Sequence, residues 1–130
     1  MIVLIYKKNI EKESLKNKFY RKVVFTGKQQ QLVLMSLKPG DDIPMEVHHG
    51  IDQFFRVEQG KALVQINGKK FILNEEDVII VPAESQHYVK NLSKKELKMY
   101  TIYSPPNHPA GRIHKTQAEA DKAEAEEHNP

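Results

Sequence analysis

The middle of the chain alternates between short segments rich in β-branched and aromatic residues and clusters of turn-forming residues. Seven such segments are KVVFT, QQLVLMSL, QFFRVEQ, KALVQIN, KFILN, DVIIVP and LKMYTIY. Several of them alternate between apolar and polar residues with the period of two that is typical of a strand. No strong amphipathic helix lies between them. Short strands at this regular spacing predict an all-β sandwich or barrel.

Asn67 and Gly68 give the clearest turn signal, between ALVQI and KKFIL. A two-residue type I′ turn needs positive φ at both central positions, which these residue types tolerate, so we expect a hairpin here. Strand alternation also predicts the apolar side chains that line the barrel, with Arg56 on the opposite face. The expected interior residues are Met35, Leu37, Phe55, Val57, Val64 and Ile66.

At 130 residues the chain has the length of one domain, which we divide into three parts. Residues 1–21 form an N-terminal arm, residues 22–104 the β-barrel, and residues 105–130 a C-terminal loop and charged tail. Within the arm, residues 7–20 are expected to be either a short helix or irregular. Residues 115–127, KTQAEADKAEAEE, favour a helix but offer only alanine as an apolar face, so we expect a weakly helical or disordered tail.

Composition excludes several classes of function. The chain has no cysteine, which excludes disulfides, zinc fingers and thiol nucleophiles. No apolar run approaches the roughly 20 residues of a membrane span, and MIVLIY is too short for a secretory signal, so we expect a cytoplasmic protein without a membrane partner. The basic excess lies in residues 1–28, with eight Lys or Arg against two Glu. Because no nucleic-acid motif accompanies it, we expect a solvated face and no nucleic-acid partner, with an electrostatic partner site as the alternative.

The segment EVHHGIDQFF, Glu46 to Phe55, carries a possible metal site. In an extended strand Glu46 and His48 point to the same side, whereas His49 points to the other. Gln53 opens the next apolar strand, and His87 enters a strand after Pro82. On residue types alone, these side chains are either metal ligands brought together by a rigid barrel or scattered, hydrogen-bonded polar residues.

Two segments resemble the paired motifs of the cupin family. The segment from Gly40 to Gly60 follows the first motif, Gly, five residues, His-x-His, three or four residues, Glu, six residues, Gly. The segment from Glu76 to Asn91 follows the second, Gly, five residues, Pro-x-Gly, two residues, His, three residues, Asn. The matching positions are Gly40, Glu46, His48, Gln53, Gly60, Pro82, His87 and Asn91. The paired spacing is far more specific than a single motif.

More narrowly, EVHHGIDQFFRVEQG, VPAESQHYVKNL and LKMYTIYSPPNHPAGRIHKTQAEA are similar to small bacterial and archaeal cupins that are labelled mannose-6-phosphate-isomerase-like. The resemblance implies a single-domain double-stranded β-helix, usually a homodimer, with a divalent metal in the barrel mouth. Glu76 and Glu84 occupy the glycine positions of the second motif, and we expect these exchanges to alter turn shape only.

Carried over to this sequence, the resemblance implies that Glu46, His48, Gln53 and His87 hold the metal. Glu46 stands where the family has its first histidine and Gln53 where it has its glutamate, so the carboxylate has moved rather than disappeared. Two imidazoles and one carboxylate suit Fe, Mn, Ni, Co or Zn better than Mg or Ca.

The function expected from this ligand set is that of a metal-dependent enzyme acting on a small oxygen-rich molecule, with sugar or sugar-phosphate isomerisation preferred. Tyr100 and His108 are the candidate catalytic residues. The loop that contains His108 and His114 is either a solvent-exposed turn or a lid over the mouth. The alternatives are an Fe(II) dioxygenase, a non-catalytic module that binds or senses a small ligand, and a barrel that has lost its metal.

Overall fold

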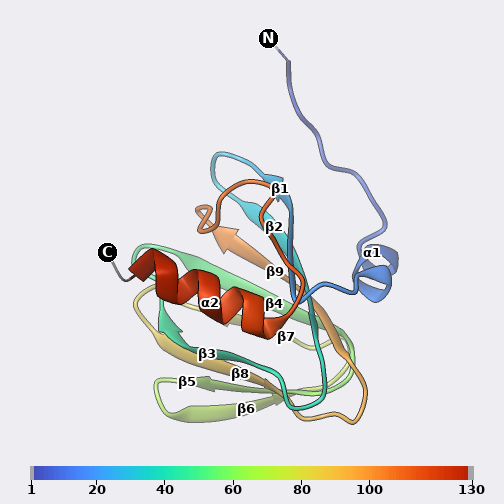
Figure 1. Ribbon diagram of the computed structural model, residues 1–130, viewed down its shortest axis with the longest axis vertical. Helices are drawn as coiled ribbons and strands as arrows, with labels where there is room; N and C mark the ends of the chain where they lie inside the picture. Colours follow the sequence, from blue (N-terminus) through green and yellow to red (C-terminus); the bar gives the residue numbers. More distant parts are fainter. Residues whose placement is uncertain (1, 129–130) are drawn as a thin grey trace.

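The computed structural model describes residues 2–128 and consists mainly of two antiparallel β-sheets that face each other (Figure 1). The larger sheet contains, in order, β10 (Ile113–His114), β1 (Arg21–Thr26), β2 (Gln31–Leu37), β9 (Leu97–Ser104), β4 (Asp52–Gln59) and β7 (Val78–Val81). The smaller sheet contains β3 (Asp42–Val47), β8 (Gln86–Asn91), β5 (Ala62–Ile66) and β6 (Lys69–Leu73). This arrangement confirms the double-stranded β-helix expected from the sequence.

The hairpin between β5 and β6 forms at the expected dipeptide. Asn67 has φ 48° and Gly68 has φ 85°, as a type I′ turn requires, and Ile66 pairs with Lys69 across the turn. The side chain of Asn67 also accepts a hydrogen bond from the backbone N–H of Gln86 at 2.9 Å. The turn therefore fixes the start of β8 as well as the hairpin register.

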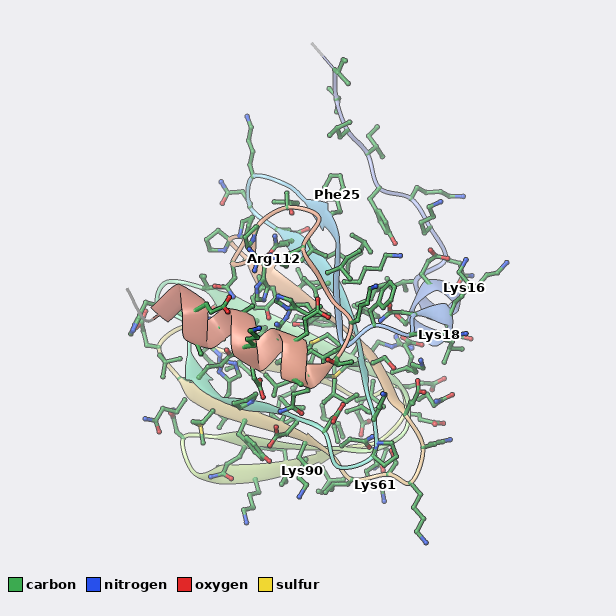
Figure 2. The ribbon with its side chains drawn as sticks, viewed as in Figure 1. Lys16, Lys18, Phe25, Lys61, Lys90 and Arg112 are labelled. Carbon is green, nitrogen blue, oxygen red and sulfur yellow. The ribbon has the colours of Figure 1, made fainter. Side chains whose placement is uncertain are left out.

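Strand alternation also placed the core correctly. Five of the six expected interior residues are buried, and Ile66 is partly buried and packs against them. Arg56 lies on the opposite face of β4, where its Nε is 2.8 Å from Oε1 of Glu58. Lys61 and Lys90 point outward from the smaller sheet, while the space between the sheets is filled by side chains (Figure 2). The core therefore lies between the two sheets.

The two glutamates at the glycine positions of the second motif keep the backbone that glycine favours. Glu76 has φ 74° and Glu84 has φ 71°. Both turns therefore contain a left-handed residue. Because side chains other than glycine are strained in this region, each glutamate adds backbone strain to its turn. The effect on turn shape expected from the sequence stays a prediction.

A short helix, α1 (Ile10–Lys16), forms within the arm, where the sequence left helix and irregular structure open. Asn9 caps it, because its Oδ1 accepts a hydrogen bond from the N–H of Lys12 at 2.9 Å. The helix contacts β2, β4 and β9 of the larger sheet. It therefore packs against this sheet on the side away from the smaller one (Figure 1).

The C-terminal tail forms α2 (Gln117–His128), which crosses in front of the barrel (Figure 1). Gln117 anchors its first turn: Oε1 accepts from the N–H of Asp42 at 2.8 Å, and Nε2 donates to Oδ1 of Asp42 at 2.6 Å. Ala120, one turn later, is buried against the core. These contacts explain how a helix with only alanine as an apolar face is held in place.

Among residues 2–128, no helix is long and apolar enough to cross a membrane. The cytoplasmic location expected from the sequence stays a prediction.

Candidate metal centre

Neighbouring strands of the smaller sheet bring three of the four expected ligands together. Glu46 on β3 pairs directly with His87 on β8, and His48 follows the end of β3. Oε1 of Glu46 lies 3.1 Å from Nε2 of His48 and 3.5 Å from Nε2 of His87. The period-two spacing of Glu46 and His48 and the cross-strand register of His87 therefore converge on one point at the barrel mouth.

The three side chains fit a transition metal ion. Their ligand atoms all lie within 4.8 Å of one another. Ligand atoms bound at about 2.0–2.2 Å to one ion are separated by roughly 3–3.5 Å, which agrees with the distances of 3.1 and 3.5 Å from Oε1 of Glu46 to the two imidazoles. In addition, Nε2 of His48 and Nε2 of His87 are buried and, apart from the Glu46 carboxylate, face no polar partner among the described residues. Because buried polar atoms are normally satisfied, two unsatisfied nitrogens facing one carboxylate favour an ion between them.

Gln53, the fourth expected ligand, lies on the facing sheet. It lies on β4, is 2% exposed, and its Nε2 donates to Oγ1 of Thr101 at 3.0 Å. That bond leaves Oε1 as a buried acceptor without a partner in the described part of the chain. An amide oxygen is a weaker ligand than a carboxylate, so Gln53 suits the role of an additional ligand rather than the principal one.

The electrostatics keep Glu46 ionised. Burial by itself raises the pKa of this carboxyl, but hydrogen bonds and charge interactions with His48 and His87 outweigh burial, and the pKa falls well below its ordinary value. A carboxylate that stays deprotonated is the form that binds a metal ion.

His49 faces away from the centre, as strand alternation predicted. Its side chain is 83% exposed, and its Nδ1 lies 2.5 Å from Oε2 of Glu84. The other oxygen of Glu84 accepts from the N–H of Gly50 at 2.6 Å. The loop after β3 is also joined to the loop before β8 by the N–H of Glu84, which donates to the carbonyl oxygen of His48 at 3.0 Å, so this connection does not depend on the His49 side chain.

Tyr100, one of the two expected catalytic residues, lies on the outer face of β9. Its ring stacks on Phe54 with centroids 6.0 Å apart, whereas the ring of Tyr103, on the inner face of β9, lies 5.5 Å from that of His48. Tyr103 is 1% exposed and is the cross-strand partner of Gln53. The sequence missed Tyr103 because both faces of LKMYTIY carry a tyrosine, and the partner strand decides which face turns inward.

His108, the other expected catalytic residue, reaches the mouth. Its backbone N–H donates to Oε1 of Gln31, and its carbonyl oxygen accepts from Nε2 of Gln31. Its Nε2 lies 3.2 Å from the hydroxyl of Tyr103. Burial, followed by the charge of Arg21, lowers the pKa of His108 to about 3. The loop is therefore part of the site wall, and His108 is a neutral imidazole near neutral pH.

A cavity of about 340 Å³ opens at this end of the barrel. Its lining includes Glu46 and His48, together with Asn107, His108 and, from α2, Glu124. Gln117, Ala120 and Glu124 recur at helical spacing, so α2 turns one face toward the mouth. No pattern in the sequence pointed to Glu124, because the tail lacks an apolar stripe that would orient the helix.

His114 is buried beneath α2, where its Nδ1 accepts from Nη1 of Arg21 at 3.1 Å. Arg21 is 7% exposed and was not among the expected site residues. It is the direct β1 partner of His114 on β10. The pairing of β1 with β10 therefore places the buried cation Arg21 next to the barrel mouth. No local sequence pattern predicted that Arg21 lies there.

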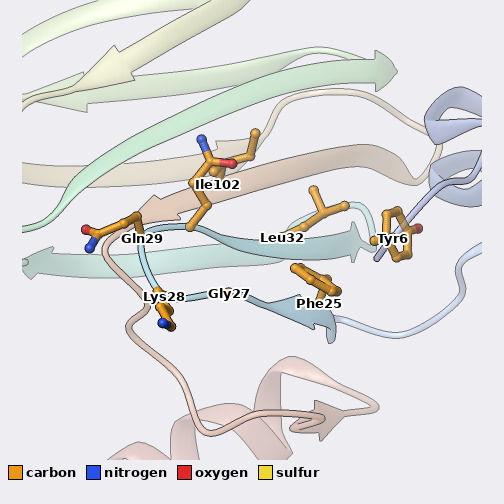
Figure 3. A pocket seen from close by; sticks show the side chains of 8 residues that line it. Tyr6, Phe25, Gly27, Lys28, Gln29, Leu32 and Ile102 are labelled. Carbon is orange, nitrogen blue, oxygen red and sulfur yellow. The ribbon is translucent and has the colours of Figure 1, made fainter. Parts of the chain in front are cut away.

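A second hollow, of about 450 Å³, lies on the outer face of the larger sheet (Figure 3). Tyr6, Phe25, Leu32 and Ile102 supply most of its apolar wall, and the rings of Tyr6 and Phe25 are 6.1 Å apart. None of the candidate metal ligands is part of its lining. This hollow is therefore better suited to apolar contact than to chemistry.

Comparisons with known proteins agree with the geometry. A family model described as Cupin domain matches residues 33–103. YrkC, an uncharacterized protein of Bacillus subtilis, is 43% identical over 122 residues, which are 89% of this chain and 66% of the relative. The chain thus spans just under two thirds of that relative. The crystal structure of BH2720 from Bacillus halodurans has a TM-score of 0.88 and 38% identity, and covers 90% of this chain and 93% of that one.

A more distant similarity concerns mannose-1-phosphate guanylyltransferase ManC of Salmonella typhimurium. It is 30% identical over 78 residues, which are 60% of this chain but 16% of that enzyme. The similarity is therefore confined to a small part of the larger protein.

Proposed function

Because the chain belongs to the cupin family, we propose that it is a metal-dependent enzyme that acts on a small oxygen-rich metabolite, with isomerase-like chemistry on a sugar or sugar phosphate. The observation that carries the proposal is the convergence of Glu46, His48 and His87, whose two buried imidazole nitrogens lack other partners among the described residues. Gln53 is the additional ligand. Fe, Mn, Ni, Co and Zn all suit these donor atoms.

A bound divalent metal would supply a Lewis acid that polarises a carbonyl or hydroxyl oxygen of the substrate. Glu46 contributes one negative charge, so the site keeps a net positive charge. Near the mouth, the hydroxyl of Tyr103 and Nε2 of His108 are 3.2 Å apart and can hold a proton between them. Burial raises the pKa of Tyr103, so this hydroxyl stays protonated near neutral pH.

The same ligand set supports a second enzyme class, an Fe(II) dioxygenase, because two histidines and one carboxylate also suit non-haem iron. A third candidate is a binding module that captures a small ligand without converting it. The similarity to part of the mannose-1-phosphate guanylyltransferase favours a sugar-related ligand over the dioxygenase. An assay for substrate turnover distinguishes the two enzymes from the binding module. Measurement of oxygen uptake distinguishes the dioxygenase from the isomerase.

The first experiment is elemental analysis of protein purified without chelators or metal-affinity resin, followed by calorimetric titration with Mn, Fe(II), Co, Ni and Zn. We expect one bound transition metal per chain. No detectable metal, together with no binding of any of these ions at micromolar concentration, would refute the proposed centre.

Two adjacent histidines give a matched pair of variants. His48→Ala removes a ligand and should weaken metal binding roughly 100-fold or more, since even the loss of a residue that hydrogen-bonds to a metal ligand costs 10–100-fold. His49→Ala removes an exposed imidazole that bonds to Glu84 and to none of the candidate ligands, so it should leave metal affinity within about threefold. Equal losses in the two variants would contradict the assignment.

We also propose that the protein forms a homodimer through the N-terminal arm, which projects away from the barrel (Figure 1). Ile2, Val3, Leu4 and Ile5 are 71–88% exposed, and this run continues into the apolar hollow at Tyr6 (Figure 3). A contiguous exposed apolar surface of this kind is typical of a protein–protein contact, and a second copy would cover both parts of it.

Light scattering tests the dimer. Leu4→Asp should convert a dimer into a monomer, whereas Ile80→Asp, on an exposed apolar side chain of β7, should leave the dimer intact. A monomeric wild type, or a Leu4→Asp variant that stays dimeric, would overturn this proposal.

A further inference from the structure

Arg21 is a buried cation with too few partners. Its side chain leaves β1 toward the barrel interior, on the same face as Val23, a core residue. Nη1 donates to Nδ1 of His114 at 3.1 Å, and the guanidinium lies 5.4 Å from the ring centroid of Tyr20. Its Nε is buried and has no hydrogen-bond partner among residues 2–128. No ion pair joins Arg21 to a carboxylate of a described side chain.

A buried and partly unpaired guanidinium such as that of Arg21 is energetically unfavourable unless an anion binds to it. A guanidinium has five N–H donors and cannot lose its charge, so burial cannot be relieved by deprotonation. Removing a charge from water is expensive unless the charge is paired and its donors are satisfied. The missing partner of Arg21 is therefore an anion that enters from outside the described chain.

The surroundings show where that anion binds. Arg21 borders a hollow of about 80 Å³, whose lining also includes Glu46 and, from α2, Glu124. Glu46 and Glu124 also line the 340 Å³ cavity of the metal centre. The two hollows thus adjoin at these two side chains. About 80 Å³ is room for roughly two water molecules, or for one small group such as a carboxylate.

We propose that Arg21 binds the carboxylate of a small substrate whose neighbouring hydroxyl or carbonyl oxygens lie at the metal centre, and that α2 covers this substrate. The inference rests on the proposed function and narrows its substrate class to an oxygen-rich monocarboxylate. A planar guanidinium matches the two oxygens of a carboxylate through parallel hydrogen bonds. His114 orients the guanidinium by accepting its Nη1 hydrogen bond, which leaves the Nε edge for the ligand.

The room and the donors at Arg21 favour a carboxylate over a phosphate ester. A divalent metal and Arg21 together carry three positive charges against one negative charge on Glu46, so the site attracts an anion. Asp121 and Glu124 also border the smaller hollow, but both are exposed and their charges are screened by water. One arginine beside a hollow of about 80 Å³ matches the two oxygens of a carboxylate but supplies few of the donors that a phosphate needs.

The test uses the full chain loaded with the metal that binds most tightly, and metal content is measured first. Isothermal titration calorimetry then compares glucuronate and lactate with glucose, as a neutral sugar, and glucose 6-phosphate, as a dianionic one. We expect at least one carboxylate to bind ten or more times more tightly than glucose, and glucose 6-phosphate to bind no better than glucose.

Arg21→Met and Lys22→Met form a matched pair, because each removes one positive charge from β1 but only Arg21 faces the interior. Arg21→Met should abolish the preference for carboxylate with metal binding retained, Arg21→Lys should reduce it by a smaller factor, and Lys22→Met should keep it. Thermal melts of the variants, followed by circular dichroism, identify any loss of fold, and Arg21→Lys carries the test if Arg21→Met does not fold.

The outcomes separate this inference from the one it rests on. A protein that binds none of the metals overturns the proposed function and this inference with it. A metal-loaded protein that binds neither carboxylate more tightly than glucose, or whose Arg21→Met and Lys22→Met variants bind carboxylate alike, overturns only the role of Arg21. Preferential binding of glucose 6-phosphate that depends on Arg21 would replace the carboxylate with a phosphate ester.

Discussion

The two ends of the barrel differ in whether their buried polar groups have hydrogen-bond partners. At the end where β8 finishes and β9 begins, Lys98 is 6% exposed, and its Nζ lies within 3.0 Å of three oxygens, from Asn17, Ser36 and Glu96. Asn91 donates twice from Nδ2, to the carbonyl oxygens of Leu37 and Lys95. Both side chains have the partners that burial requires, so this end is structural.

At the other end, where β8 begins, buried polar atoms lack partners. Nε2 of His48, Nε2 of His87, Oε1 of Gln53 and Nε of Arg21 are all unsatisfied within the described chain. Lys98 and Arg21 make the contrast plain, because both are buried cations at similar exposure and only Lys98 has a carboxylate partner. Of the other unsatisfied atoms, Oγ of Ser14 lies on α1, and Nε of Arg56 and Oε1 of Glu58 form an ion pair on the outer face of β4. The unsatisfied atoms that face the barrel interior therefore indicate where ligands bind.

The largest effect on folding should come from replacing Lys98. Lys98→Met leaves the carbonyl of Asn17 and the hydroxyl of Ser36 without their donor and should lower the free energy of unfolding by about 3 kcal/mol. Arg21→Met should change it by only about 1 kcal/mol in either direction, because no partner loses a salt bridge. Urea denaturation of metal-free protein measures both. Equal destabilisation by the two substitutions would contradict the distinction between the ends.

A metal ion should stabilise the folded protein by binding only at the site formed by Glu46, His48 and His87. At a free metal concentration 100 times the dissociation constant, the free energy of unfolding should rise by about 2.7 kcal/mol. His87→Ala should abolish this gain, because it removes a ligand. Asn91→Ala should lower stability in the absence of metal and yet keep the full gain. Differential scanning calorimetry with and without metal provides the measurement, and a gain retained in His87→Ala would place the ion elsewhere.

The pH dependence of stability should reveal the burial of His108. Its pKa is lowered to about 3 in the folded protein, whereas an unfolded histidine titrates near 6.5. Between these values the unfolded state binds more protons, so stability is complete above about pH 6.5 and falls as the pH is lowered toward 3. From pH 7 to pH 5 the loss attributable to His108 should be about 1–2 kcal/mol.

His108→Gln is the variant that checks this assignment. Urea denaturation of metal-free wild type and variant at pH 7 and pH 5 should show a smaller loss in the variant. An identical pH dependence in both proteins would mean that His108 is not the group responsible.

The smallest expected effect on stability comes from replacing Glu76 or Glu84, the two glutamates with positive φ, by glycine. Glu76→Gly should stabilise the protein by about 0.5 kcal/mol, because glycine relieves a positive φ but adds entropy to the unfolded chain. Glu84→Gly should give no net gain, because it also removes the bonds to His49 and Gly50. Thermal melts under identical conditions measure both variants. A larger gain for Glu84→Gly than for Glu76→Gly would contradict this account.

Much of the candidate site could be predicted from local patterns. The two-residue period pairs Glu46 with His48 and turns His49 outward, and the spacing of the two motifs brings in His87. These inferences succeed because strand geometry fixes the side on which a residue lies. Tyr100 was the expected catalytic residue, but Tyr103 lies on the inner face, because alternation gives two faces without saying which one is inside, and only the pairing of Tyr103 with Gln53 decides it.

By itself, the sequence determined the class of fold, the hairpin at Asn67-Gly68, most of the core and three candidate ligands that converge at one point. Only the tertiary structure decided that Arg21, His108 and Glu124 surround those ligands. They come from β1, a loop and α2, so their approach depends on long-range strand pairing and on the anchoring of α2 by Gln117. Neither cause leaves a periodic pattern in the sequence, because each depends on contacts between residues far apart in the chain.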